Sequence, residues 1–583
     1  MKKVISFILL LFLIFFTVAG CKNKKPDIAE LLIIQTTDIH GTIFPFDFIE
    51  NKPTNHSLSA IYSMIKRERL LYKDAVVLLD NGDYLQGQPT VYYYNFVDTS
   101  SLHLAAQVMN YMSYDAASVG NHDLETGHPV YDRYRKQLAM PYLAANVLHK
   151  MSGEPYFQPY TVIKRQGIKI AVLGLTTPGI SNWLPENLWS GMVVTDMVET
   201  AKKWIPIIQD KEAPDLIIGL FHSGVDAEKV TNSESGFMEE NASRLVAEKV
   251  TGFDLILAGH DHQKHIEKVI NPLGDTVILL DAQSHSKSVS KIKVKFQLNS
   301  KTHKYDKTYV AEIIGVENEP VDSLFMETFN AQFEAIKKFC SAPIGEFTQD
   351  VDSKDAYFGN SAFIDLVHQV QLDVTGAEIS FTDPLSYRTK IEKGPVFVSD
   401  LFKLYKFENT LYTLSLTGNE IDKYLEFSYT LWFNLMRNKT DHLLRLKQTE
   451  NGNLVLDQPY FNFSSAAGIE YMVDVSKPEG DKVHILGLSN GAPFYSDSTY
   501  TVALNSYRGS GGGGHLTQGA GLSVEELLHR KITSSEFDMR YYLRKWIEDK
   551  KTITPKKGTN WRIIPEEYFE LGKRKDMELL FGE

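Results

Sequence analysis

The most constraining feature of the chain is a pattern that occurs four times in its first half. A short apolar run is followed at once by polar side chains that can bind metals. Such runs predict buried strands of a layered α/β fold, with helices expected between them over 57–71 and 239–250. In these folds, sites form where the carboxyl ends of strands open into loops. The apolar runs and their polar segments are 31–34 with 37–40, 75–79 with 80–83, 216–220 with 222–223, and 255–257 with 259–262.

The residues at these strand ends carry carboxylate, imidazole and amide donors, which suit Zn²⁺, Mn²⁺ or iron better than metals that prefer thiolates. Asp38 and His40 alternate at one strand end and should point to a common side. Asp83 could bridge two ions about 3.5–4 Å apart, and Asn121 follows Gly120 in a tight turn. Any one histidine alone would more often be a core residue, but the ordered set favours a metal site. Its other members are His222, His260 and His262.

In this order the motifs resemble the signature of the calcineurin-like metallophosphoesterases, D-x-H, G-D, G-N-H, H and G-H-x-H. They are Asp38-Ile39-His40, Gly82-Asp83, Gly120-Asn121-His122, His222 and Gly259-His260-Asp261-His262. The resemblance implies two divalent ions, Zn, Mn or Co, at two sites that share Asp83. The first site would take Asp38, His40, Asp83 and His262, and the second would take Asp83, Asn121, His222 and His260.

The same resemblance implies that His122 is the catalytic imidazole, which protonates the leaving oxygen or stabilises charge beside it. Some family members place an aspartate three residues after this histidine to orient it. Here that position holds Glu125, while Asp123 lies next to His122. The sequence therefore leaves two candidate catalytic carboxylates, Asp123 and Glu125. Six further histidines without such neighbours are expected at the surface: His56, His103, His128, His265, His285 and His515.

The 583-residue chain is too long for one hydrophobic core. Its net charge of −12 argues against a binder of DNA or RNA duplexes, which needs a basic face. We expect an α/β protein with a layered β-sandwich metallophosphoesterase domain, flanked by helices, over 30–318. A linker helix is expected over 319–341, a C-terminal α+β nucleotide-binding domain over 342–550, and an extension over 551–583.

The second half is similar to the two-domain bacterial nucleotidases, in which the C-terminal domain binds the nucleoside. Within that family, Tyr507-Arg508-Gly509 and the segment 179–201 resemble the 2′,3′-cyclic-nucleotide 2′-phosphodiesterase/3′-nucleotidase branch. The 5′-nucleotidase/UDP-sugar hydrolase branch is the near neighbour, and an inactive nucleotide-binding lipoprotein is a further alternative. The segments that carry the resemblance are 81–89, 385–388, 414–420, 461–463 and 505–512.

The nucleotidase resemblance implies substrate-binding residues in this half. Tyr507 would stack on one face of the nucleobase, and Phe461 or Phe463 on the other, because the two phenylalanines share a face if their segment is a strand. Asn462 would bind the base edge, and Arg388 would hold a phosphate group. The alternatives are core packing for the phenylalanines, a surface position for Arg388 and a flexible loop for the glycines at 511–514.

The N-terminus has the pattern of a bacterial lipoprotein signal. Lys2 and Lys3 precede an apolar run over 4–16, and small residues lead to Cys21. We expect cleavage after residue 20, lipid on Cys21, and a tether over 21–29 that holds the exported protein on a membrane, facing the periplasm or the cell surface. Ordinary cleavage or an uncleaved anchor are the alternatives. With Cys340 as the other cysteine, no internal disulfide is expected, and we expect a monomer.

Overall fold

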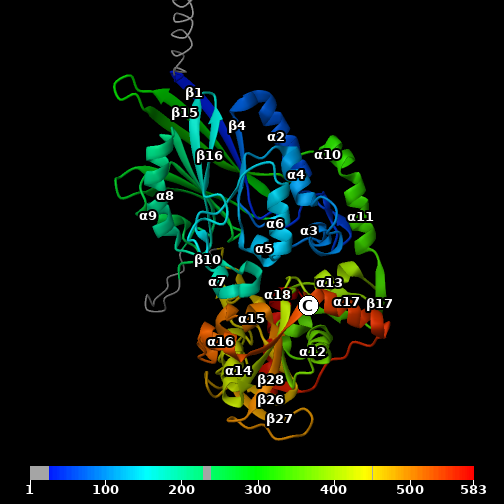
Figure 1. Cartoon of the computed structure of the whole chain (residues 1–583). Helices are drawn as coiled ribbons and strands as arrows, with labels where there is room; N and C mark the ends of the chain where they lie inside the picture. The colour runs from blue at the N-terminus through cyan, green and yellow to red at the C-terminus, as the bar shows by residue number, and fades with distance from the viewer. Residues whose placement is uncertain (1–24, 227–237, 450, 583) are drawn as a thin grey trace, which may run out of the picture.

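The computed structural model describes residues 25–226, 238–449 and 451–582, so the predicted signal peptide and Cys21 lie outside the described residues. Two domains lie one above the other in Figure 1 and are joined along one side. The connection consists of two helices, α10 (Ser323–Thr328) and α11 (Asn330–Cys340), rather than the single expected helix. No helix in the described part of the chain is both long enough and apolar enough to cross a bilayer.

The N-terminal domain is a sandwich of two six-stranded sheets. Their strand orders are β16-β15-β1-β4-β5-β6 and β13-β14-β12-β11-β9-β8. The first sheet comprises β1 (Ile28–Thr36), β4 (Val76–Asp80), β5 (Ala116–Ser118), β6 (Tyr142–Leu143), β15 (Ser288–Leu298) and β16 (Tyr305–Gly315). The second comprises β8 (Tyr160–Arg165), β9 (Ile168–Thr176), β11 (Leu216–His222), β12 (Leu255–Ala258), β13 (Lys264–Ile270) and β14 (Thr276–Ala282).

The central strands β4, β11 and β12 are buried on both faces, which explains why they are continuous apolar runs. In β1, Leu31 and Ile33 pack between the two sheets, whereas Leu32 and Ile34 face a second core under the flanking helices. Helices α2 (Leu58–Tyr72) and α4 (Leu104–Met112) cover the first sheet, and α8 (Met197–Glu212) and α9 (Ser243–Lys249) cover the second. The predicted layered α/β sandwich is confirmed, and the helix expected over 239–250 is the shorter α9.

The strands that carry the motifs are parallel neighbours. In the first sheet β1 pairs with β4, and β4 with β5. In the second sheet β11 pairs with both β9 and β12. Because parallel strands end at the same sheet edge, the polar segments that follow them meet in space. In Figure 1 this end of the sandwich faces the C-terminal domain, with α5 (Asn121–Glu125) and α7 (Ile180–Trp183) at the boundary.

The C-terminal domain is of the α+β type. Its main sheet has the order β25-β19-β28-β22-β29. Helices α12 (Ala362–Thr375) and α14 (Gly418–Trp432) contribute to its two apolar cores. The sheet strands are β19 (Ile379–Thr382), β22 (Thr410–Thr417), β25 (Ser465–Ala467), β28 (Thr499–Asn505) and β29 (Lys531–Asp538).

The expected extension over 551–583 is instead an integral part of this domain. Strand β30 (Thr552–Ile553) pairs with β17 (Pro343–Phe347), and β31 (Trp561–Ile564) pairs with β26 (Ile469–Asp474). Trp561 is buried and stacks on Tyr471 at 5.6 Å. The short apolar segments here gave little periodic signal, so their long-range pairing was not visible in the sequence.

Candidate metal and nucleotide site

The seven predicted metal ligands all lie at one end of the β-sandwich, each at or just beyond a strand end. Six of them form two groups whose possible ligand atoms lie within 4.8 Å of one another. The first group is Asp38, His40 and His262, and the second is Asp83, His222 and His260. The seventh residue, Asn121, places its Oδ1 3.0 Å from Nε2 of His222.

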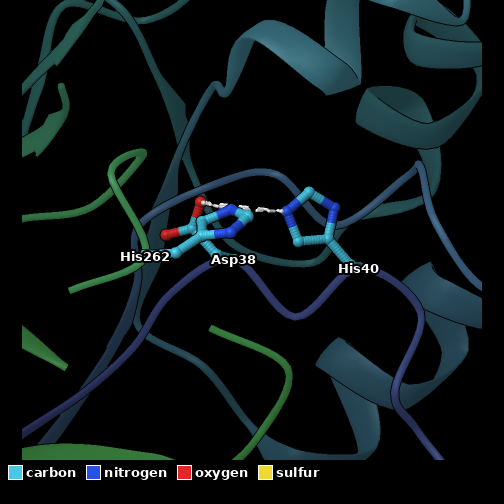
Figure 2. Close-up of side chains that lie close together, drawn as sticks. All are labelled: Asp38, His40 and His262. Atoms are coloured by element: carbon cyan, nitrogen blue, oxygen red, sulfur yellow. Dashed lines mark hydrogen bonds and ion pairs between the residues drawn. The ribbon is translucent and has the colours of Figure 1, made fainter. Parts of the chain in front are cut away.

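In the first group the imidazoles of His40 and His262 point their Nε2 atoms toward each other beside the carboxylate of Asp38 (Figure 2). Nε2 of His40 lies 3.0 Å from Nε2 of His262, which lies 3.4 Å from Oδ1 of Asp38. Nδ1 of His40 donates a hydrogen bond to the carbonyl oxygen of Gln86 at 3.0 Å. The lone pair of Nε2 is therefore the one that can bind a metal ion. Burial, together with the nearby His262, lowers the pKa of His40 to about 3, so its imidazole is in the neutral form that binds metals.

The second group has the same construction. Nε2 of His222 lies 3.1 Å from Oδ2 of Asp83. Nδ1 of His222 donates to the carbonyl oxygen of Asn81 at 2.7 Å and so turns Nε2 toward the group. The backbone N–H of His40 donates to the carbonyl oxygen of Asp83 at 3.0 Å, so Asp83 lies next to the first group as well.

The backbone at these positions is strained. Five of the seven residues, namely Asp38, His40, Asp83, His260 and His262, have φ between 48° and 80°. Non-glycine residues rarely adopt this left-handed conformation, and such outliers concentrate at functional sites. The glycines of the motifs permit close approaches: a Cβ on Gly120 would lie 2.1 Å from Oδ1 of Asp83, and one on Gly259 would lie 2.2 Å from Oγ1 of Thr37.

This donor set fits two divalent ions. Each group combines at least one buried carboxylate with imidazole nitrogens whose other ring nitrogens are already engaged, as in His40 and His222. Burial opposes ionisation of Asp38, but a hydrogen bond from His262 and the charge of His222 outweigh it and lower the pKa of this carboxyl below its usual range. Together the two groups offer carboxylate oxygens and imidazole nitrogens, a donor set of the type that Zn²⁺ and Mn²⁺ accept.

His122 lies beside the cage, with its backbone N–H donating to Oδ1 of Asp83 at 2.8 Å. Its Nδ1 contacts the Glu125 carboxylate, three residues on. Burial disfavours the protonated ring, but the charges of Asp83 and Glu125 outweigh burial and raise the pKa of His122 to about 9. The imidazolium form suits a proton donor.

Asp123 stabilises a backbone turn, whereas the sequence made it a candidate for orienting His122. Its carboxylate accepts backbone N–H groups of Asp83, Tyr84 and Leu85, and the hydroxyl of Tyr142. It therefore holds the Gly82-Asp83 turn in place, and of the two candidate carboxylates it is Glu125 that contacts the ring of His122.

A cavity of about 700 Å³ lies between the domains and joins the metal groups to the C-terminal domain. From the N-terminal domain it is lined by Asn121, His122, Glu125 and His260, among others. Phe461, Tyr507 and Asp383 line it from the C-terminal domain. Two of the predicted substrate-binding residues, Phe461 and Tyr507, thus share one cavity with the predicted catalytic histidine.

Arg508 connects the segments that carry Phe461 and Tyr507, the two aromatic residues in the cavity lining. It is 1% exposed and pairs with Asp383 at 2.9 Å. Its guanidinium also donates to the carbonyl oxygens of Phe461 at 2.9 Å and Gly512 at 2.8 Å. A Cβ on Gly512 would lie 2.5 Å from the ring of Tyr507, so the glycine run packs against that ring and is not a free loop.

The structure does not bring the other predicted nucleoside residues into the cavity. Residues 460–462 form a 3₁₀ turn rather than a strand, and Phe463 is fully buried and stacks on Trp432 at 5.2 Å, which agrees with the core-packing alternative. Asn462 directs Oδ1 toward Arg508. Arg388 contacts the carbonyl oxygen of Leu580 and the rings of Tyr387 and Phe581, so it is no phosphate clamp in this arrangement.

Three residues near the metal groups were missed. His285, expected at the surface, stacks on His40 at 5.0 Å; its position just beyond β14 was an available signal. Trp183 lines the cavity and stacks on His260 at 5.6 Å. Glu240 lies 2.9 Å from the same histidine, and no local pattern marks it. His103 and His515, also expected at the surface, are fully buried.

Two family models match the chain. Residues 31–264 match the calcineurin-like phosphoesterases, and residues 343–519 match the C-terminal domain of 5′-nucleotidases. With the donor groups at the strand ends, these matches define a metal-dependent phosphoester hydrolase. The chain thus combines a calcineurin-like phosphoesterase domain with a 5′-nucleotidase C-terminal domain, as the motifs predicted.

The chain is similar over 92% of its length to the trifunctional nucleotide phosphoesterase protein YfkN of Bacillus subtilis, at 28% identity, but spans only 39% of that protein. It is 25% identical to the 2′,3′-cyclic-nucleotide 2′-phosphodiesterase/3′-nucleotidase of Yersinia enterocolitica over 92% of this chain and 88% of that one. The solved structure of a putative 5′-nucleotidase from Staphylococcus aureus matches 92% of this chain and 100% of its own, with a TM-score of 0.75 at 19% identity. The structural likeness supports the two-domain fold.

Proposed function

We propose that this chain hydrolyses 2′,3′-cyclic nucleotides and 3′-nucleotides. The proposal rests on the lining of one cavity. This cavity brings together His122, the metal-group residue His260 and the aromatic residues Phe461 and Tyr507. The similarity to the Yersinia enterocolitica phosphodiesterase/nucleotidase over most of both chains supports this substrate class.

In this proposal, Asp38, His40, Asp83 and His262 hold one divalent ion, and Asp83, Asn121, His222 and His260 hold the other. When bound, the two ions supply Lewis acidity toward phosphoryl oxygens and lower the pKa of water. His122 donates a proton from Nε2 to the departing ribose oxygen, while Glu125 accepts from Nδ1–H and keeps the ring oriented. The base stacks between Phe461 and Tyr507, at about 1–3 kcal/mol per contact.

A second candidate is a 5′-nucleotidase or UDP-sugar hydrolase, because the fold is shared with a putative 5′-nucleotidase. An inactive nucleotide-binding protein is disfavoured, because both metal groups keep their donors.

The test is a substrate panel of 2′,3′-cyclic AMP, 3′-AMP, 5′-AMP and a UDP-sugar. Each is assayed with Mn²⁺, Co²⁺ or Zn²⁺ and again with a chelator. We expect kcat/KM to be highest for the first two substrates and activity to vanish with the chelator. A preference for 5′-AMP would favour the second candidate, and hydrolysis unaffected by chelation would contradict the metal assignment.

We further propose that the protein is exported and held on a bacterial membrane, facing the periplasm or the cell surface, as a monomer with lipid on Cys21. The small residues before Cys21 support this. Substitution Cys21→Ser should release the protein from the membrane fraction; retention on the membrane would contradict lipid anchoring. Light scattering of the released protein should give the mass of one chain.

A further inference from the structure

The histidines of the metal groups differ in the hydrogen-bond partner of the ring nitrogen that is not available to a metal. For His40 and His222 this partner is a backbone carbonyl oxygen, of Gln86 and Asn81 respectively. For His260 it is a side chain: Nε2 lies 2.9 Å from Oε1 of Glu240. A hydrogen bond at Nε2 leaves Nδ1 of His260 as the atom available to a metal.

The face of the His260 ring is covered as well. The Trp183 ring lies parallel to it, with an interplanar angle of 8° and 5.6 Å between centroids. Trp183 ends the short helix α7, and Gly179 precedes that helix. A Cβ on Gly179 would lie 2.2 Å from the Trp183 ring, so the indole is closely packed against the backbone on that side.

Glu240 is fixed to the same strand ends as the ligands. Its carbonyl oxygen accepts the hydroxyl of Ser223 at 2.7 Å and that of Thr177 at 3.0 Å. These two residues directly follow β11 and β9. The Glu240 side chain is 43% exposed and, like Trp183, lines the interdomain cavity. It is thus held by its backbone while its carboxylate reaches His260.

We infer that Glu240 and Trp183 are positioning residues for His260: the carboxylate fixes the tautomer and direction of the ring, and the indole prevents the ring from turning. This inference rests on the proposed metal-dependent hydrolysis. A carboxylate on the outer nitrogen of a ligand histidine makes that ligand more basic, and its loss typically lowers metal affinity about 10–100-fold. The effect should be confined to the metal position that uses His260.

The experiment titrates metal-free full-length protein with Mn²⁺ and follows binding by calorimetry. We expect two sites in the unmodified protein. In Glu240→Ala the affinity of one site should fall about 10–100-fold while the other is unchanged. Glu240→Gln, whose amide oxygen still accepts a hydrogen bond, should recover most of this loss. Trp183→Ala should weaken the same site, and Trp183→Phe, which keeps an aromatic face, should weaken it less.

Glu186→Ala and Trp204→Phe are matched controls, because Glu186 is exposed and Trp204 packs on Tyr160 in another part of the domain. Thermal unfolding of each variant checks that it is folded, and Trp183→Phe keeps the test valid if Trp183→Ala is not. Unchanged affinity at both sites in Glu240→Ala would overturn the inference, as would loss of one Mn²⁺ from the stoichiometry, which would make Glu240 a ligand. Two bound Mn²⁺ without hydrolysis of any phosphoester would instead overturn the proposed function.

Discussion

The two ends of the interdomain cavity are built in different ways. At the metal end, the ligands follow parallel strands of two packed sheets, and five of the seven have left-handed backbone. At the nucleoside end, Phe461 lies in a 3₁₀ turn and Tyr507 in a four-residue helix, and one buried arginine, Arg508, ties both together. Regular sheets thus position the metal groups, whereas short irregular segments position the aromatic residues that we propose bind the nucleobase. Changes at the metal end should abolish turnover, and changes at the nucleoside end should mainly alter KM.

The largest effect is expected for Asp83→Asn at the metal end. Asparagine has the same shape and tolerates left-handed backbone, but it removes the negative charge that acts on both metal groups. Because loss of an outer-shell partner alone costs about 10–100-fold in metal affinity or activity, we expect kcat/KM to fall by more than about a hundredfold. Asp226→Asn, at an exposed carboxylate paired with Arg244, is the control. Full hydrolysis by Asp83→Asn would contradict the metal assignment.

His122→Asn should give the next largest loss. Removal of a general acid lowers kcat by about 10²–10⁴-fold, while Mn²⁺ stoichiometry should stay unchanged. With p-nitrophenyl phosphate, whose leaving group needs little protonation, the fall should be much smaller. An equal fall for nucleotide and p-nitrophenyl phosphate would show that His122 is not the proton donor.

Tyr507→Ala tests the nucleoside end. Loss of one stacking contact of about 1–3 kcal/mol should raise KM for nucleotides about 5–150-fold, with little change for p-nitrophenyl phosphate. Phe463→Leu is the matched control, because this phenylalanine stacks on Trp432 in the core. It should lower the free energy of unfolding and leave KM unchanged; a raised KM would place Phe463 in the cavity after all.

The smallest effect concerns the stability of the C-terminal domain. Burial raises the pKa of Asp365 to about 6, despite a hydrogen bond from Gly558 N–H at 2.8 Å. The folded state therefore holds this proton more tightly than the unfolded chain, and the associated stability is present below about pH 4 and lost as pH rises to about 6. Asp365→Asn should remove this loss and stabilise the domain at pH 7 by at most about 3 kcal/mol. Denaturant unfolding at pH 4 and pH 7 measures it; a parallel pH dependence in the variant would contradict it.

The metal end was largely predictable from sequence, and the nucleoside end only in part. Asp38, His40 and Asp83 follow strands whose apolar runs are unambiguous, and parallel strands bring their ends together. The sequence left Phe463 open between base stacking and core packing, and it could not show that its neighbours form a 3₁₀ turn rather than a strand. Arg388 is directed elsewhere by its contacts with the C-terminal helix. Contacts between residues this far apart in the sequence produce no periodic pattern of apolar and polar residues from which they could be predicted.

The left-handed backbone at the ligands has a consequence for folding as well as for chemistry. Each such residue costs on the order of 1–3 kcal/mol unless its surroundings compensate for it, and the fold brings Nε2 of His40 within 3.0 Å of Nε2 of His262, where both nitrogens could bind one cation. Bound ions therefore favour the folded chain over the unfolded one. The fraction of folded protein should then depend on the supply of divalent cations, so that a chelator lowers the melting temperature even when no substrate is present.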